Sequence, residues 1–300
     1  MSDPTPIVLS FGFGLALVVF VGGVVARRVS AKRVELGDAG GSGDEVVAAG
    51  VVGPPRLPEG KVPVWAYGPL DWLGAGFVFC VFSGLVMLAA GADPQGEVVI
   101  SAGVLAANIG FQFMIAGVVC ALVLWRVNVV DWLGLRWREW PWLFLIAPGA
   151  VGVMWAVFYV LHFTGYMKLM ESFGVETVQE TVQLLQQSED PVVLGLMAFA
   201  AVVAAPICEE VVFRGYLYPV LKRYGGMWPA AIATALVFGA AHGSMTALLP
   251  LVIFGGLLVY LYERTGSLWA PMAVHFCFNG ATVVVQILAR VFDIPLEPPT

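Results

Sequence analysis

The sequence predicts an all-α protein, a polytopic bundle of about eight transmembrane helices. Of its 300 residues, 59% are hydrophobic and 12% are charged, whereas a soluble domain is about 45–50% apolar and about 25% charged. The mean hydropathy is +0.87. Apolar stretches of the length that a helix needs to cross a bilayer core, about 20 residues, recur along the chain. We therefore expect a multi-pass integral membrane protein.

The first apolar stretch, residues 7–26, is followed by four basic residues and preceded by none. It lacks the basic n-region of a cleavable signal peptide, so residues 1–33 are predicted to form an uncleaved N-terminal anchor with its N-terminus outside. Residues 34–69 are rich in Gly, Pro and acidic residues and show no sustained helical period. This composition is typical of a flexible linker, here on the cytoplasmic side.

Seven further spans are predicted, at residues 72–92, 98–125, 142–162, 192–217, 228–244, 248–262 and 268–288. We group them into a helical membrane region at 70–190 and a motif-bearing helical core at 191–290, followed by a short tail at 291–300. Cytoplasmic loops carry an excess of Lys and Arg. An arrangement with both termini outside places nearly all basic residues on the inner side, namely Arg27, Arg28, Lys32, Arg33, Arg56, Lys61, Arg126, Arg136, Arg138, Lys222, Arg223 and Arg264.

Residues 163–190 place apolar side chains at helical spacing between two predicted spans. The pattern predicts an amphipathic helix on the outer interface, and a lid over a site mouth is the alternative. His162 lies at the outer end of the preceding span and belongs to no motif. We expect it to have an interfacial or packing role.

The core contains three polar pairs within apolar stretches. Ionisable side chains at bilayer depth are costly and usually face the protein interior for a functional reason. Glu210 and Arg214 are four residues apart, so they can meet on one side of a helix, while Glu209 points about 100° away. A structural Glu–Arg pair explains two of these residues. The second carboxylate, which has no second cation, favours a functional role such as general base.

The two other pairs each place a histidine within a later span. His242 follows Phe238 by four residues, and Asn279 follows His275 by four residues. A single intramembrane histidine is readily explained as a hydrogen-bond donor between helices. Two of them, together with the acids and an amide, on three helices near the membrane midplane favour a catalytic site.

Several function classes are excluded or disfavoured. The chain has no basic patch, so we expect no nucleic-acid partner. The four cysteines lie in apolar stretches without a C-x-x-C pair, which disfavours a disulfide framework. No serine or cysteine occupies a recognisable nucleophile motif, which argues against a Ser or Cys protease.

The motifs Glu-Glu-x-x-x-Arg, Phe-x-x-x-His and His-x-x-x-Asn, in this order on successive apolar helices, resemble those of a protease family. It is the CAAX prenyl endopeptidase and bacteriocin-processing family, also called CPBP or Abi, whose members are intramembrane proteases. The resemblance covers roughly residues 190–289, and no motif position departs from the pattern. It is the ordered trio of motifs that is specific.

The resemblance implies a catalytic role for four residues and a supporting role for three. Glu209 and His242 would activate a water, and His275 and Asn279 would line the oxyanion side. Glu210 and Arg214, with Phe238, would support them. The residue types also permit a zinc-like site with Glu209, His242 and His275 as ligands, so the cofactor is either none or a divalent metal.

We therefore expect an endopeptidase that cleaves a membrane-associated or lipidated protein or peptide, placed in the inner (cell) membrane of a bacterium. The bilayer and the peptide substrate are the expected partners. A non-catalytic scaffold or bacteriocin-immunity-type protein on the same fold is the main alternative. A proton-coupled transporter using the paired acids is a third hypothesis, which predicts an internal repeat. The sequence shows no such repeat.

Overall fold

The computed structural model describes residues 4–38, 60–90, 101–173 and 188–292, which form helices joined by short connections without a strand. Within these residues, seven helices are long and apolar enough to cross a membrane. They include α1 (Thr5–Asp38), α2 (Pro69–Ala90), α3 (Ala102–Leu124), α5 (Leu143–Phe163), a continuous helix over Pro191–Gly225, α12 (Met245–Thr265) and α13 (Trp269–Val291). The predicted all-α, multi-pass fold is confirmed.

An eighth apolar helix, α11 (Met227–Ala241), is shorter than the sequence pattern predicts. Its 15 residues rise only about 22 Å, less than the bilayer core of about 30 Å. The helix ends at Ala241, followed by His242, Gly243 and Ser244 before α12 begins. Gly243 has a φ of 70°, a left-handed conformation that glycine adopts without a Cβ penalty.

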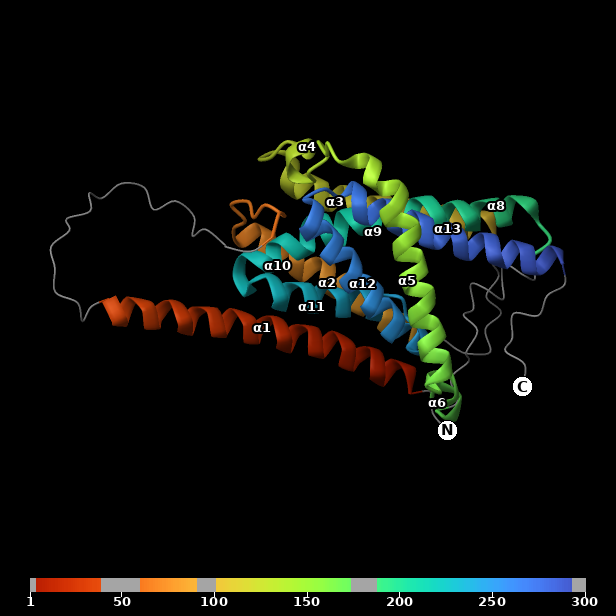
Figure 1. The fold of residues 1–300 in the computed structure, drawn as a ribbon, viewed down its shortest axis with the longest axis horizontal. Coiled ribbons are helices and arrows are strands. Elements are labelled where there is room, and N and C mark those ends of the chain that lie inside the picture. Colours follow the sequence, from red (N-terminus) through yellow and green to blue (C-terminus); the bar gives the residue numbers. More distant parts are fainter. Residues whose placement is uncertain (1–3, 39–59, 91–100, 174–187, 293–300) are drawn as a thin grey trace.

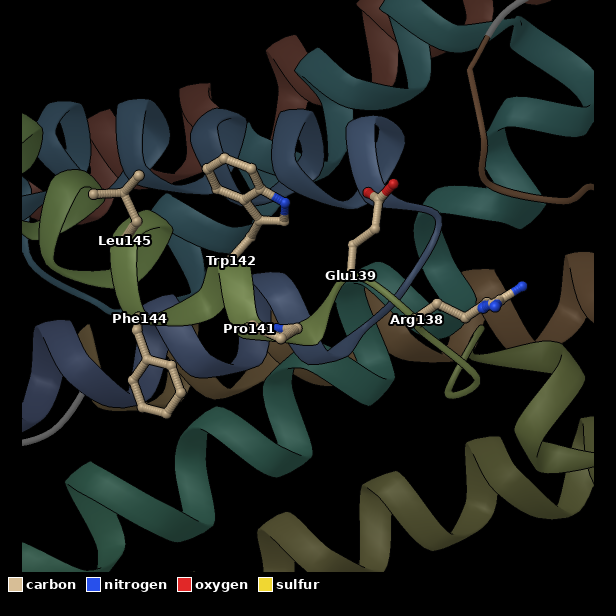
Figure 2. Close-up of a pocket in the computed structure, with 6 residues that line it drawn as sticks. All are labelled: Arg138, Glu139, Pro141, Trp142, Phe144 and Leu145. Carbon is tan, nitrogen blue, oxygen red and sulfur yellow. The ribbon is translucent and has the colours of Figure 1, made fainter.

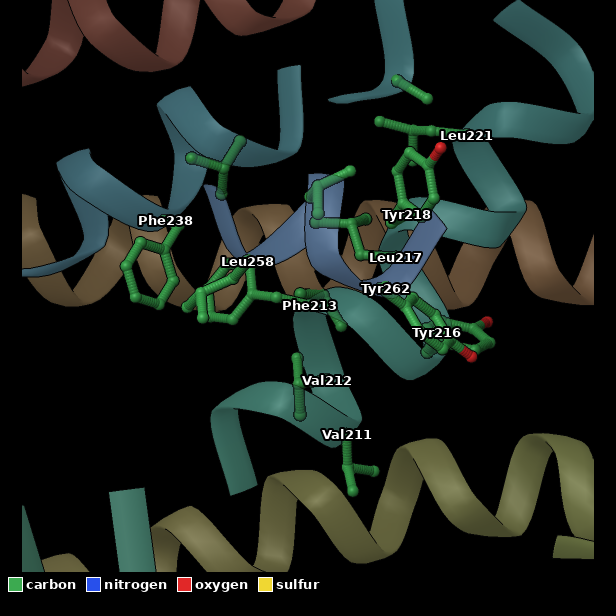
Figure 3. Packing of buried hydrophobic residues seen from close by; sticks show 14 of the residues in the cluster. Val211, Val212, Phe213, Tyr216, Leu217, Tyr218, Leu221, Phe238, Leu258 and Tyr262 are labelled. Carbon is green, nitrogen blue, oxygen red and sulfur yellow. The ribbon is translucent and has the colours of Figure 1, made fainter. Parts of the chain in front are cut away.

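The continuous helix Pro191–Gly225, which we call the central helix, changes its hydrogen-bond register twice. It consists of α8 (Pro191–Phe199), a π-helical segment at Ala200–Ala204, α9 (Ala205–Glu209), a second π-helical segment at Glu210–Leu217 and α10 (Tyr218–Gly225). π-Helical turns inside α-helices occur frequently at functional sites. All eight residues of the second segment are buried, and Figure 3 shows Val211 pointing from it toward α3.

Helix α1 packs along α11 and α10 (Figure 1). A Cβ on Gly23 would lie 2.5 Å from the Cβ of Pro229, so glycine permits this close approach. Small residues at helix contacts are typical of membrane proteins, because they let backbones approach each other. Residues 5–38 therefore form part of the bundle and pack against the helix that carries the second motif.

The predicted linker, residues 34–69, is only partly within the described residues. Its first residues continue α1 to Asp38, and residues 39–59 lie outside the description. Residues 60–68 pack against the bundle, with Val62 and Tyr67 buried. The Lys222 ammonium donates to the carbonyl of Val62, and Tyr224 donates to that of Tyr67. Residues 60–68 are therefore docked on the bundle, a contact that the linker composition does not predict. The division into domains stays a prediction.

The loops predicted to be cytoplasmic meet at one end of the bundle. Arg27, in the last third of α1, donates to the carbonyls of Lys222 and Arg223. Leu268 at the start of α13 donates to the carbonyl of Leu133, after α3. Lys222, one of the basic residues placed on the inner side, is 2% exposed and forms a buried ion pair with Glu263.

The outer segment at 163–190 is described up to residue 173 and from residue 188. It contains the short helix α6 (Tyr166–Ser172), which buries Met170 and packs against α5 and the start of α12. The remainder of the predicted amphipathic segment lies outside the described residues, as do residues 293–300 of the predicted tail. His162 is exposed and lies against Phe163.

Candidate active site

The central helix, α11 and α13 bring together the Glu-Glu-x-x-x-Arg motif, the Phe-x-x-x-His motif and His275. Glu209 ends α9, and Glu210 and Arg214 follow it in the second π-helical segment. His242 caps the C-terminus of α11, and His275 lies near the start of α13. The predicted convergence of these side chains from separate helices is what the structure shows.

Glu210 is the centre of a buried polar chain. Its Oε1 accepts from Nη1 of Arg214 at 2.8 Å and lies 2.8 Å from Nδ1 of His275. All three side chains are at most 3% exposed. An ionised carboxylate only accepts hydrogen bonds, so the contact assigns a proton to Nδ1 of His275. The Glu–Arg pair predicted from spacing is thus present, and His275 extends it.

The buried Arg214 guanidinium has further partners. Its Nη2 donates to the carbonyl of Gly255 on α12, and its Cζ lies 4.2 Å from the centroid of the Phe238 ring. The same ring contacts the imidazoles of His242 and His275, with centroid distances of 4.8 and 5.9 Å. The Phe238 ring therefore packs against the cation and against both histidines.

Glu209 faces both histidines. Its Oε2 lies 3.9 Å from Nε2 of His242 and 3.9 Å from Nε2 of His275. This oxygen is buried and has no hydrogen-bond partner among the described residues, although the whole side chain is 22% exposed. A buried carboxylate oxygen without a partner is costly and calls for an explanation. Here it is aimed between two imidazole nitrogens.

The backbone determines which nitrogen of His242 carries the proton. Its Nδ1 lies 2.7 Å from the carbonyl oxygen of Phe238, which is an acceptor only. Nδ1 must therefore donate, which leaves Nε2 of the neutral ring as an acceptor. The His242 side chain is 31% exposed. It is the most exposed of the three side chains in this cluster, since Glu209 is 22% and His275 is 3% exposed.

Asn279 makes a contact that the motif did not predict. Its Nδ2 donates to the carbonyl of Ala201 at 2.8 Å. In the first π-helical segment the N–H of Ala205 donates to Ala200, and the residue five after Ala201 is Pro206, which has no N–H. The Asn279 amide thus supplies a donor that the backbone lacks. Ala201 lies eight residues before Glu209, about 12 Å along the helix, so this contact joins α13 to the central helix away from the Glu209–histidine cluster.

The metal alternative gains no support from the donor geometry. Across the described ranges, no group of three or more His, Cys, Asp or Glu side chains is placed so that it could hold a metal ion. Nε2 of His242 and Nε2 of His275 each lie 3.9 Å from Oε2 of Glu209, farther apart than the N and O ligands of one tetrahedral zinc ion. The four cysteines are free. We therefore derive no step that uses a metal.

An open surface pocket of about 520 Å³ lies elsewhere, around the start of α5 (Figure 2). Its lining contains none of the motif residues and comprises Arg138, Glu139, Pro141, Trp142, Phe144 and Leu145. Arg138 and Glu139 directly precede the short helical turn Trp140–Trp142 that leads into α5. The pocket is distinct from the polar cluster.

Comparisons with known proteins agree with the motifs. Residues 191–281 match a family described as type II CAAX prenyl endopeptidase Rce1-like. The chain is 26% identical over 142 residues to a Bacillus subtilis protein named "Putative membrane peptidase YdiL", which covers 46% of this chain and 57% of the relative. It is 32% identical over 133 residues to an uncharacterized 24.3 kDa protein of Escherichia coli, covering 43% of this chain and 58% of the relative.

A human relative extends the same similarity. The chain is 32% identical to CAAX prenyl protease 2 of Homo sapiens over 101 residues, which are 25% of this chain and 29% of that protein. The chain thus spans less than two thirds of the length of each of these relatives. No solved structure matches it. The predicted family resemblance is confirmed for the region that carries the motifs, and the helices make the chain a multi-pass integral membrane protein.

Proposed function

We propose that this protein is an intramembrane endopeptidase that hydrolyses a peptide bond of a membrane-associated or lipidated protein or peptide. The observation that carries the proposal is the position of Glu209. Its unpaired Oε2 lies 3.9 Å from Nε2 of both His242 and His275. The similarity of residues 191–281 to a CAAX prenyl endopeptidase family supports the reaction class.

Glu209 and His242 suit the activation of a water. Both present acceptors, because Nδ1 of His242 donates to the Phe238 carbonyl and leaves Nε2 free. Two acceptors 3.9 Å apart can each accept one O–H of a single water. Transfer of one proton to Glu209 leaves a hydroxide that attacks the carbonyl carbon, and the same proton is then delivered to the leaving amine. General acid–base catalysis of this kind contributes about 10²–10⁴-fold.

His275 suits the stabilisation of the oxyanion. Glu210 accepts from Nδ1, so a doubly protonated ring would present its Nε2–H to the developing negative charge. The Asn279 amide donates to Ala201, away from this cluster, so a part for it at the oxyanion rests on the family resemblance alone.

The test is cleavage of a membrane-anchored fluorogenic peptide by the purified protein in detergent or nanodiscs. Glu209→Gln keeps the shape and removes the base, and we expect kcat to fall at least about 10²-fold. Glu139→Gln, at an exposed position beside α5, is the matched control and should retain activity. A strong chelator should have no effect.

Two results would contradict the proposal. One is the absence of cleavage by the unaltered protein with any membrane-anchored peptide. The other is full activity in Glu209→Gln, which a non-catalytic scaffold would also show as an unchanged phenotype. Loss of activity with chelator, restored by added zinc, would instead replace the metal-free mechanism with the metal-dependent one.

A further inference from the structure

The short helix α6, outside the family-matched region, is attached to the first turn of α12 by one hydroxyl. Oη of Tyr166 lies 3.2 Å from the carbonyl oxygen of Met245 and 3.1 Å from that of Thr246. Tyr166 follows Gly165, whose φ of 76° turns the chain sharply after α5. Burial raises the pKa of the Tyr166 phenol, so the hydroxyl keeps its proton and acts as a donor.

The sequence of α12 explains why a donor is needed there. Pro250 lies inside the helix, and proline has no backbone N–H. The N–H of residue 250 would otherwise bond the carbonyl of Thr246, four residues earlier. In an apolar surrounding an unpaired carbonyl costs free energy, and neighbouring groups normally satisfy the carbonyls that a proline leaves unpaired. The Tyr166 hydroxyl is positioned to do this.

The first turn of α12 lies close to His242 along the chain. Only Gly243 and Ser244 separate His242 from Met245, the first residue of α12. Ser244 caps α12, since its Oγ accepts from the N–H of Ala247 and lies 3.0 Å from Oγ1 of Thr246. The N–H groups of His242 and Gly243 donate back to α11. A shift of the first turn of α12 is therefore transmitted to His242 through a connection of two residues.

We propose that Tyr166 is a positioning residue for the reaction. By donating to the Thr246 carbonyl that Pro250 leaves unpaired, it fixes the first turn of α12 and holds His242 opposite Glu209. Tyr166 touches neither substrate nor the reacting atoms and acts through His242. The inference deepens the proposed function and rests on it, because it assigns to α6 a role in holding the pair of groups that activates water.

The experiment is a double-mutant cycle between Tyr166→Phe and Pro250→Ala. Tyr166→Phe removes the donor and keeps the ring, and misplacement of a catalytic group by about 1 Å can lower the rate by about 10²-fold. We expect kcat to fall about 10-fold or more with KM nearly unchanged. Pro250→Ala restores an N–H that can reach the Thr246 carbonyl, so in that background Tyr166→Phe should lower kcat less than about 2-fold.

The matched control is Tyr159→Phe on α5, which removes an exposed hydroxyl and keeps the ring packed on Phe163. It should leave kcat unchanged in both backgrounds. An equal loss of kcat on Tyr166→Phe with and without Pro250→Ala would overturn the proposal, because the hydroxyl would then act elsewhere. An unchanged kcat in Tyr166→Phe would overturn it as well.

Amide hydrogen exchange separates this proposal from the proposed function. Tyr166→Phe should speed exchange in residues 243–249 and leave α13 unaffected, whether or not any peptide is cleaved. Faster exchange in a protein without activity would sustain the Tyr166 contact and refute the protease. Unchanged exchange in an active protein would refute the role of Tyr166 and leave the protease standing.

Discussion

Arg214 shows how one side chain can serve both stability and chemistry. It is fully buried, pairs with Glu210 at 2.8 Å, donates to a carbonyl of α12 and lies over Phe238. Through Glu210 it also determines the charge that His275 faces. A buried ion pair adds little to stability compared with an apolar pair, but removing one partner leaves an uncompensated charge.

Arg214→Gln should therefore lower the free energy of unfolding by about 3–5 kcal/mol, because it leaves the Glu210 carboxylate unpaired by a cation. Equilibrium unfolding in mixed micelles, followed by tryptophan fluorescence, measures the change. Arg136→Gln breaks an exposed pair with Asp131 and should cost less than about 1 kcal/mol. Equal costs for the two variants would show that burial of the Arg214 pair has no energetic consequence.

Asn279 shows where motif reasoning reaches its limit at the scale of a residue. The pattern His-x-x-x-Asn predicted that both side chains share a helical face, and they do. The motif gave no sign that the amide would bond the carbonyl of Ala201. That carbonyl lacks a backbone donor because the helix is π-helical there and the residue five positions later is Pro206, which has no N–H. The sequence pattern also gave no sign that the Tyr166 hydroxyl would bond α12. The one available signal was Pro250 inside a predicted span, because a proline leaves the carbonyl four residues earlier without its helical partner.

At the scale of the element, α1 is a structural part of the bundle rather than a separate anchor. It runs along α11, and its buried Phe13 and Phe20 pack against aromatic rings of α2. Gly23 is at the closest approach, since an added Cβ would lie 2.5 Å from Pro229 Cβ and 2.9 Å from the carbonyl of Gly225. The apolar pattern of residues 7–26 predicts a span, but it does not predict which helix covers it.

Gly23→Ala should destabilise the protein by about 1–3 kcal/mol, the usual cost of overpacking, because the backbone of α1 must move away from α11. Gly22→Ala is the matched control. A Cβ at Gly22 meets nothing within 4 Å, and alanine favours helix by up to about 1 kcal/mol over glycine. Thermal unfolding of both variants in detergent compares them, and a Gly23→Ala protein as stable as Gly22→Ala would contradict the close packing.

At the scale of the whole molecule, the loops that carry most of the Lys and Arg gather at one end of the bundle. The hydrogen bonds of Arg27 and Lys222 join the last third of α1 and residues 60–68 to the end of the central helix. Glu263 at the end of α12 completes this group by pairing with Lys222 and accepting from the N–H of Val62. The predicted arrangement, with both termini outside, also places these basic loops together on one side of the membrane. The side of the membrane that this end faces stays a prediction from the positive-inside rule.

Cysteine labelling tests that orientation. In a variant with all four native cysteines replaced by alanine, an impermeant maleimide added to intact spheroplasts should label Ser172→Cys on α6. Arg136→Cys, in the basic loop after α3, should react only after permeabilisation. The reverse pattern would place the basic loops outside and contradict the predicted topology.

Composition and periodicity alone determined that this chain is a helical membrane protein with two acids, two histidines and an amide on three core segments. Those properties depend on local chemistry, namely hydrophobicity and the turn of a helix. Only the tertiary structure decided that Glu209 Oε2 lies between two imidazoles, that residues 60–68 are docked and that α11 ends early at His242. These depend on which backbone groups lack a partner and on which helix surfaces approach closely, and both are set by contacts between residues far apart in the chain.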